Sequence, residues 1–344
     1  MVNMEGLPDD VIVEIFSFLP HQLLLLEVRT VCRRWYTLSH SADLWQTVDL
    51  TLGFNQTEKQ AMVSNLKRVQ DHVKILKVDP RLLQTIFKND IWQFLTLKTL
   101  HLNTLCKTTV SVLGEPNLRY PRLEKVYFTS AFDNKLVLSA FSGLKLDTFE
   151  WKYSGPFQQF RETILALGKM DNLQKLNVSF CPKVNSHVLL PDKIWTPNVP
   201  LKLREISLSG NNNITSEVAF RIIKLCCCLQ SFELASCPSI QSFDTASNKQ
   251  GISNTRSECV QKPQKTDHSH MKSVNFVGSL NVEDSVIIAL SYICPDLRNL
   301  RLTDCKKLTK NVLGVVFRNC RFIDSLEIAN CTFKRIEYKD TVTL

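Results

Sequence analysis

Glycine is scarce in this chain of 344 residues, which contains only 10 of them. That is about 3% of the residues, against a usual share of roughly 7%. Folds that depend on many tight hairpins or on glycine-rich phosphate loops are therefore disfavoured. No apolar run approaches the roughly 20 residues of a membrane-spanning helix. The first residues lack the basic and apolar regions of a signal peptide, so we expect the protein in the cytoplasm, the nucleus or both.

Motifs that would assemble an active site are absent as well. We find no phosphate-binding P-loop, no dinucleotide glycine motif, no His-Glu-x-x-His motif and no nucleophile elbow. The sequence therefore predicts a protein that is not an enzyme and that needs no metal and no cofactor. Twelve cysteines are present, but disulfides are not expected in a reducing compartment. The cysteines need another explanation.

Charge is unevenly distributed along the chain. Residues 1–50 hold three arginines and seven acidic residues, a net charge of −4, whereas the remaining residues carry +13. We expect the two parts to face different partners. A nucleic-acid partner is disfavoured, because few aromatic residues are interleaved with the basic ones.

The first fifty residues predict three short helices. Apolar residues recur at helical spacing between Val11 and Leu19, and Pro20 ends that segment. A second apolar stretch runs from Leu23 to Val28, and a third from Val31 to Leu38. Three short helices cannot bury so many large apolar side chains among themselves. Unburied apolar surface of this kind usually marks an interface.

These fifty residues resemble the F-box family. They contain its Leu-Pro pair (Leu7-Pro8), an Ile-Phe within the first helix, a second Leu-Pro, a Val-Cys-Arg-x-Trp motif at residues 31–35 and a closing Leu-Trp. The alternative is that these helices only cap and shield the part of the chain that follows. A cap of that kind does not need the Val-Cys-Arg-x-Trp motif. The run of residues 21–30 is one residue longer than the family's pattern.

The resemblance implies a partner. It implies docking on the S-phase-kinase-associated adaptor subunit and, through it, on the cullin and RING subunits of a ubiquitin ligase. The family's adaptor-facing or supporting positions correspond here to Leu7, Pro8, Ile15, Phe16, Leu19, Val31, Cys32 and Trp35. A nucleophilic role for Cys32 is the alternative for that residue, but no motif pairs the thiol with a base.

From residue 73 onward one apolar pattern returns: an apolar residue, two others, an apolar residue, one other and a third apolar residue. Ten instances begin at Val73, Leu97, Leu123, Leu146, Leu173, Leu203, Leu229, Met271, Leu297 and Ile323. Apart from one step of 42 residues, the steps of 23–30 residues follow the period of leucine-rich repeats. A single repeat cannot bury its own apolar face, so neighbours must stack. We therefore predict an α/β solenoid, a horseshoe with parallel strands on its concave face and helices outside.

Seven of the twelve cysteines keep a fixed place in this register. Counted from the first apolar residue of each repeat, position +8 holds Cys181, Cys237, Cys305 and Cys331, and position −3 holds Cys226, Cys294 and Cys320. This resembles the cysteine-containing class of leucine-rich repeats, in which such thiols fill tight buried turns. Zinc binding by residues 226–228 is the alternative, but no second pair with matching spacing exists.

The predicted organisation has three parts. Residues 1–50 form an F-box, residues 51–332 form about ten repeats of the cysteine-containing type, and residues 333–344 form a C-terminal tail. The long step places an insertion at about residues 241–270. Its polar composition cannot offset the entropy of ordering it, so we predict a flexible loop that is either a tolerated surface insertion or a site of partner contact.

Outward-facing strand positions supply the candidate substrate surface: Lys125, Tyr127, Lys152, Lys175, Asn177 and Arg301. The lysines predict a basic, partly aromatic patch for an acidic or phosphorylated segment, with a row of solvated lysines as the alternative. Together with the F-box resemblance, this surface indicates the non-catalytic substrate-recognition subunit of an SCF-type cullin–RING ligase, which directs a protein substrate to ubiquitylation and proteasomal degradation. The alternative is a repeat scaffold or inhibitor that works without a ligase.

Overall fold

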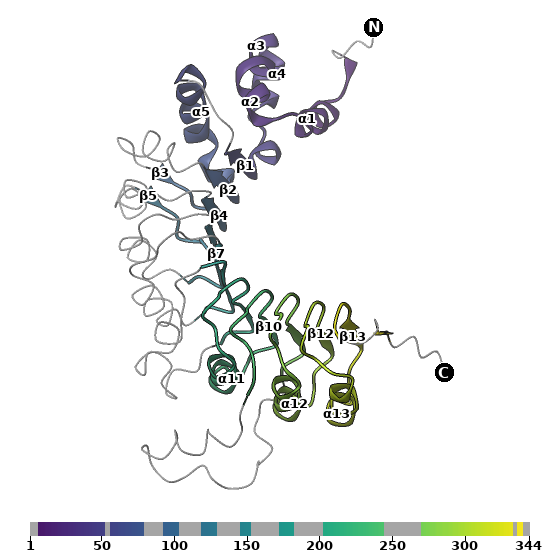
Figure 1. Cartoon of the computed structure of the whole chain (residues 1–344). Coiled ribbons are helices and arrows are strands. Elements are labelled where there is room, and N and C mark those ends of the chain that lie inside the picture. The colour runs from purple at the N-terminus through teal and green to yellow at the C-terminus, as the bar shows by residue number, and fades with distance from the viewer. Residues whose placement is uncertain are drawn as a thin grey trace. The chain divides into compact units, whose positions relative to one another are not determined.

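The computed structural model describes residues 6–51, 56–78, 92–102, 118–128, 145–152, 172–181, 202–243, 270–332 and 336–339. The chain divides into two compact units, Met1–Phe149 and Glu150–Leu344. Figure 1 shows the order of the elements. In the described ranges, no helix combines the length and the apolar character needed to cross a membrane.

The first unit begins with a helical domain. Its elements in order are α1 (Asp9–Ser17), α2 (His21–Leu23), η2 (Leu24–Val28), α3 (Arg29–Val31), α4 (Arg33–Leu38) and η3 (Ala42–Trp45). α1 buries Ile12 and Phe16, which lie one turn apart on the same side of the helix. Leu24, Leu25 and Trp45 complete the core of the domain.

A π-helical turn accommodates the extra residue of this domain. η2 lies between α2 and α3, and the N–H of Arg29 bonds to the carbonyl of Leu24, five residues back. An i→i+5 bond encloses one residue more than the i→i+4 bond of an α-helix. The helix therefore takes up one inserted residue while α2 and α3 continue on either side of it.

Parallel strands follow the helical domain in the first unit. β1 (Thr47–Leu50), β2 (Ile75–Val78), β4 (Thr99–Leu102) and β6 (Lys125–Phe128) pair in that order. Between β1 and β2 lie α5 (Gln56–Val69) and η4 (Gln70–His72), and β3 (Trp92–Gln93) pairs with β5 (Leu118–Arg119) in a separate two-stranded sheet.

Strand β1 extends the repeat series toward the N-terminus beyond the predicted first repeat. Trp45, Val48 and Leu50 are buried and have the same apolar spacing as the later repeats. The closing Leu-Trp of the F-box pattern thus also opens the first layer of the sheet.

The second unit continues with parallel strands. β7 (Thr148–Lys152) begins just before the boundary, and the strands that follow in sheet order are β8 (Lys175–Ser179), β9 (Glu205–Ser207), β10 (Ser231–Glu233), β11 (Ser273–Asn275), β12 (Asn299–Arg301) and β13 (Ser325–Ile328). Three of the connections contain α11 (Ser216–Leu225), α12 (Asp284–Ile293) and α13 (Asn311–Asn319), which lie side by side (Figure 1). Within the predicted C-terminal tail, β14 (Ile336–Lys339) pairs antiparallel with β13.

The predicted register holds in every repeat. All ten residues that were predicted to open a repeat, from Val73 to Ile323, are buried, and the corresponding strand begins two residues later in each case. The predicted α/β solenoid, with a helical region before an open parallel sheet, is confirmed. The domain boundaries at residues 50 and 332 stay predictions, and residues 244–269 of the predicted insertion lie outside the described residues.

A left-handed residue follows each strand from β8 to β13. At position +7 of six successive repeats, φ is positive at Phe180, Gly210, Ser236, Gly278, Asp304 and Asn330. Glycine adopts this conformation without strain, whereas in the other residues it strains the local backbone. At Gly210 a side chain would meet a second obstacle, because its Cβ atom would collide with the ring of Phe180.

In five of these six repeats, the side chain that follows the left-handed residue bonds to the backbone of the preceding repeat. The thiols of Cys237, Cys305 and Cys331 lie 3.3, 3.4 and 3.1 Å from the carbonyl oxygens of Leu208, Phe276 and Leu302, each at position +5 of the preceding repeat. Six of the seven register cysteines are buried and Cys331 is half-buried, so the predicted packing role is confirmed. No group of three or more metal-ligating side chains occurs in the part of the chain that the structure describes.

Asn211 and Ser279 occupy the same +8 position as these cysteines. The Nδ2 atom of Asn211 donates to the carbonyls of Val178 (2.7 Å) and Leu208 (2.6 Å), and its Oδ1 accepts the N–H of Cys181 at 2.8 Å. The hydroxyl of Ser279 likewise donates to a carbonyl of the preceding repeat at 2.6 Å and accepts the N–H of Cys237 at 2.9 Å. Both side chains are fully buried, and they supply the partners that buried backbone groups require.

Candidate functional site

Besides Tyr36, whose hydroxyl accepts a hydrogen bond from Arg68, the helical domain exposes four large apolar side chains to solvent. Phe18 is 82% exposed and Val31 60%, and Ile15 and Leu23 are each 37% exposed. We call these four residues the docking set. Large apolar side chains in water do not stabilise the domain, and several of them on one small domain are typical of a surface that another protein covers.

The residues that resemblance assigned to the adaptor differ in exposure. Pro8, Ile15, Val31 and Cys32 are exposed, Leu7, Leu19 and Trp35 are half-buried, and Phe16 is buried. The ring of Phe16 packs edge-on against Trp35, with 5.2 Å between the ring centroids. Phe16 therefore supports α1 against α4, which is the supporting one of the two roles predicted for these positions, and its side chain does not reach the surface.

Phe18 and Leu23 were missed by the sequence analysis. They lie on either side of the second Leu-Pro pair, of which only Leu19 was predicted to be adaptor-facing or supporting. The available signal was the spacing of Phe18 three residues after Ile15, which places both on one side of a helix.

Polar contacts hold the edges of this domain together. Arg34 on α4 forms an ion pair with Asp9 on α1 at 2.6 Å and also donates to the carbonyl of Leu7. The thiol of Cys32 accepts the N–H of Trp35 at 3.5 Å and so occupies the N-cap position of α4. Cys32 thus has a structural role in the helix as well as an exposed position.

His21 ties the start of α2 to the end of the domain. Its Nε2 atom lies 3.1 Å from the carbonyl oxygen of Leu44, and its ring packs on Trp45 with 5.0 Å between centroids. Burial lowers the pKa of His21 and outweighs the hydrogen bond to Leu44 and the charge of Asp49, which both act to raise it. The folded domain therefore favours the neutral imidazole.

We expect the helical domain to lose stability as the pH falls below about 6.5, the ordinary pKa of histidine. Because folding lowers the pKa of His21, the unfolded chain binds the proton more readily, and acidification favours unfolding. His21→Gln should reduce this pH dependence, and the same change at exposed His72 should not. Thermal unfolding between pH 5 and 8 measures the effect, and equal slopes for wild type and His21→Gln would contradict it.

The sheet of the first unit carries an outward row of polar and aromatic residues. Asp49, Lys77, His101 and Tyr127 are in register on four neighbouring strands. Lys77 lies 3.5 Å from Asp49, and the rings of His101 and Tyr127 stack with 4.3 Å between centroids. The predicted substrate residues Lys125 and Tyr127 are both half-buried on β6, and their contact with a substrate stays a prediction.

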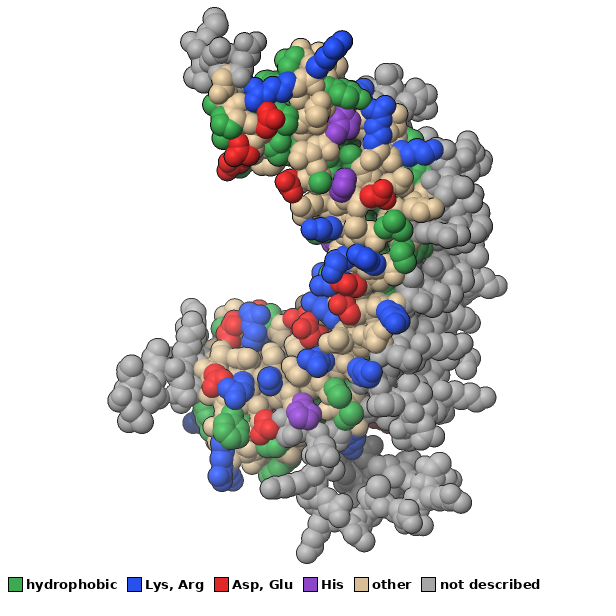
Figure 2. Space-filling model, turned by 180° about the vertical axis from the view of Figure 1, so that it is seen from behind, with side chains coloured by type: hydrophobic (Ala, Val, Ile, Leu, Met, Phe, Trp, Pro, Cys, Tyr) green, Lys and Arg blue, Asp and Glu red, His purple; other side chains and the backbone are tan. Residues whose placement is uncertain are grey.

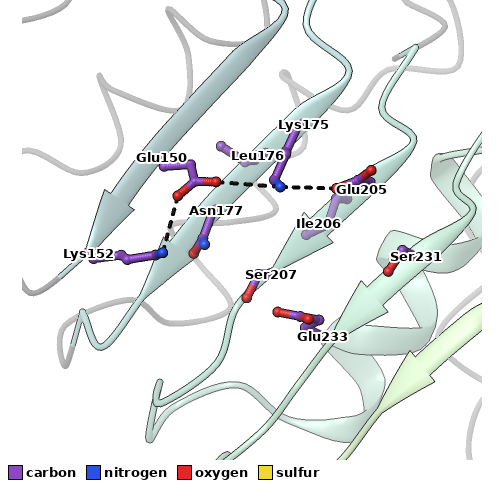
Figure 3. Close-up of a pocket in the computed structure, with 10 residues that line it drawn as sticks. All are labelled: Glu150, Lys152, Lys175, Leu176, Asn177, Glu205, Ile206, Ser207, Ser231 and Glu233. Carbon is purple, nitrogen blue, oxygen red and sulfur yellow. Dashed lines mark ion pairs between the residues drawn. The ribbon is translucent and has the colours of Figure 1, made fainter. Parts of the chain in front are cut away.

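The second unit contains a pocket of about 230 Å³ on the outward face of strands β7–β10. Figure 3 shows five charged side chains around it, with Asn177, Ser207 and Ser231 between them. The charged residues are Glu150, Lys152, Lys175, Glu205 and Glu233. The serine and asparagine side chains are short, and they leave the space that the charged groups surround.

Ion pairs engage both lysines of this pocket. Glu150, whose side chain is only 11% exposed, lies 3.2 Å from Lys152 and 3.5 Å from Lys175, and Lys175 also lies 3.3 Å from Glu205. Burial alone would lower the pKa of Lys175, but hydrogen bonds and charge from Glu205 and Glu150 raise it. Lys175 therefore stays protonated, and its charge is balanced within the protein.

The predicted basic patch does not describe this pocket. Two lysines stand against three glutamates, so the formal charge is −1. Over the second unit, Figure 2 also shows basic and acidic side chains intermingled. Glu233 is exposed, and it has no ion-pair partner among the described residues.

The other two predicted substrate residues of this unit differ in position. Asn177 lines the pocket and is buried, where it accepts a hydrogen bond from the hydroxyl of Ser179. Arg301 lies on β12, outside the pocket, and forms an ion pair with Glu327 at 2.8 Å.

Comparison with known proteins identifies the helical domain and its relatives. Residues 4–51 match the family model described as F-box-like. The F-box/LRR-repeat protein 21 of Bos taurus is 26% identical over 204 residues, which are 55% of this chain and 43% of that protein. Its counterpart in Mus musculus is 27% identical over 204 residues, which again cover 55% of this chain and 43% of that protein. The match thus spans less than half the length of these relatives.

A solved structure is also similar to this chain. It is a chain of the crystal structure of the Rad7 and Elc1 complex in yeast, 15% identical in sequence, with 91% of this chain and 75% of that chain covered and a TM-score of 0.41.

Proposed function

We propose that this chain, which its F-box-like domain and its relatives assign to the F-box/leucine-rich-repeat family, is the substrate-recognition subunit of an SCF-type ubiquitin ligase. In this proposal the helical domain docks on the S-phase-kinase-associated adaptor subunit through the docking set, and the adaptor links it to the cullin and RING subunits. The outward face of the repeat sheet holds a protein substrate in the cytoplasm or nucleus.

One observation carries the proposal. A single chain joins an F-box-like domain that leaves Phe18 and Val31 in water to a parallel sheet whose outward face is lined with polar and charged side chains. The first surface suits a permanent apolar contact, and the second suits an exchangeable contact that charge complementarity selects.

The chain's contribution to the reaction is positional. Its own residues do not transfer ubiquitin in this proposal, because the conjugating enzyme that the ligase recruits does that chemistry. Holding a substrate lysine beside the activated ubiquitin replaces an encounter in solution with one inside a complex, and that raises the effective concentration of the two groups.

Reconstitution tests the proposal. The purified full chain should capture the adaptor subunit in a one-to-one molar ratio. Affinity capture from cells with and without proteasome inhibition should identify proteins that accumulate when degradation is blocked. Those proteins should be ubiquitylated by the assembled ligase only when this chain is present. A folded chain that captures substrates but never the adaptor would favour the ligase-independent scaffold instead.

A further inference from the structure

We infer that the pocket on strands β7–β10 recognises a positively charged side chain, lysine or arginine, of the bound protein. The inference rests on the proposed substrate-binding function, and it names the chemistry that the pocket selects. It differs from the acidic or phosphorylated segment that the lysines alone had predicted.

The pocket's lysines are not available to an anion. Lys175 is held between two carboxylates, those of Glu150 and Glu205, and Lys152 is held by Glu150. An incoming phosphate or carboxylate would have to displace these partners. It would also leave Glu150, which is almost fully buried, with fewer counter-charges, and removing the partner of a buried charge is costly.

The pocket's acidic groups, in contrast, retain binding capacity. Glu233 has no ion pair among the described residues, and the carboxylate of Glu205 has one lysine partner and is 54% exposed. An ionised carboxylate offers about four acceptor positions. Each of these glutamates can therefore accept hydrogen bonds from an added ammonium or guanidinium group without giving up a partner.

Strand register puts the two carboxylates on either side of a space. Glu205 on β9 is in register with Ser231 on β10, and Glu233 on β10 is in register with Ser207 on β9. The two glutamates are thus diagonal neighbours with a serine beside each, as Figure 3 shows. A long basic side chain could enter between them, with its charged end near both carboxylates.

The floor of the pocket adds no competing charge. The hydroxyl of Ser207 is buried and lies 3.2 Å from that of Ser179 and 3.3 Å from that of Ser209. These neutral hydroxyls satisfy one another. The selective groups of the pocket are therefore Glu205 and Glu233.

Short peptides test the inference directly. Immobilised octapeptides of glycine and serine that carry two central arginines, lysines, glutamates or phosphoserines serve as probes for the full-length chain at low salt. We expect the arginine and lysine peptides to bind at least tenfold more tightly than the two acidic ones. Glu233→Gln should weaken their binding about tenfold, whereas Glu217→Gln, an exposed position on α11, should leave it unchanged.

Every contrary result has a definite meaning. Preference for an acidic peptide, equal binding of all four, no binding at all, or full binding by Glu233→Gln would each overturn the inference. Adaptor capture by the same preparations is measured in parallel. Loss of peptide selectivity with normal adaptor capture removes only this inference, whereas a wild-type chain that never captures the adaptor removes the proposed function, whatever the peptides do.

Discussion

Replacing both Phe18 and Val31 with aspartate is expected to weaken adaptor capture about a thousandfold, which corresponds to about 4 kcal/mol. Both side chains are mostly in water in the structure, so the substitutions remove little of the domain's own packing. On docking, however, the apolar area contributes about 25 cal/mol for each Å² that is buried. The aspartates would also have to lose water, and that cost adds to the lost apolar contact.

Three assays on the same variant separate docking from substrate binding. We expect adaptor pull-down and reconstituted ubiquitylation to be lost, while substrate pull-down persists, so that the variant acts as a trap. The matched control is Tyr292→Asp, because Tyr292 is a 68% exposed apolar residue on α12 of the second unit. Normal adaptor recruitment by the Phe18/Val31 variant would show that the docking set is not the docking surface. Trp35 is a poorer choice for this test, because its ring packs against Phe16.

Asn211→Ala is expected to destabilise the second unit by about 3 kcal/mol, at the upper end of the cost of leaving a buried polar group unsatisfied. The substitution removes the acceptor of the Cys181 N–H and a donor to the carbonyl of Val178. Asn211 is fully buried, so the backbone groups that lose it are shielded from bulk water.

Two further variants and a local measurement test whether the lost hydrogen bonds cause this destabilisation. Asn212→Ala changes the exposed neighbour and should cost less than about 0.5 kcal/mol. Asn211→Cys introduces the residue that four other repeats use at this position, and it should cost less than alanine because a thiol can still donate. Urea unfolding followed by circular dichroism gives the stabilities, and hydrogen exchange at the Cys181 amide reports the local bond. An amide that exchanges equally slowly in Asn211→Ala would disprove this role.

The spacing of apolar residues made the repeats predictable. It did not predict the layer of β1 or the left-handed residues after the strands. Trp45 was assigned to the F-box pattern, which concealed that it also begins the layer of β1. Four of the six left-handed residues are glycine, asparagine or aspartate, the types that adopt this conformation most readily. Phe180 and Ser236 break that pattern, so residue type alone does not mark the position in every repeat. Their conformation is fixed by the turn that the neighbouring repeats impose.

For the candidate sites, too, the sequence predicted which surfaces are involved but not which side chains contact one another. The F-box motif predicted that the helical domain has a partner-facing surface, but it could not distinguish buried Phe16 from exposed Phe18, because helix orientation decides that. The lysines of the pocket were predicted to face outward, and Lys175 does line it. The error concerned its charge balance, since pairing with Glu150 and Glu205 depends on which strands are neighbours.

The +8 side chains also bear on how such a protein changes length during evolution. Cys237, Ser279 and Cys305 each bond to the repeat immediately before their own, so each of these layers needs only its nearest neighbour to form its bond. A duplication of one complete repeat would supply both the donor and the acceptor of a new layer at once. The number of layers can therefore drift in a lineage by whole repeats, whereas an insertion of part of a repeat would have to be placed in a connection between strands.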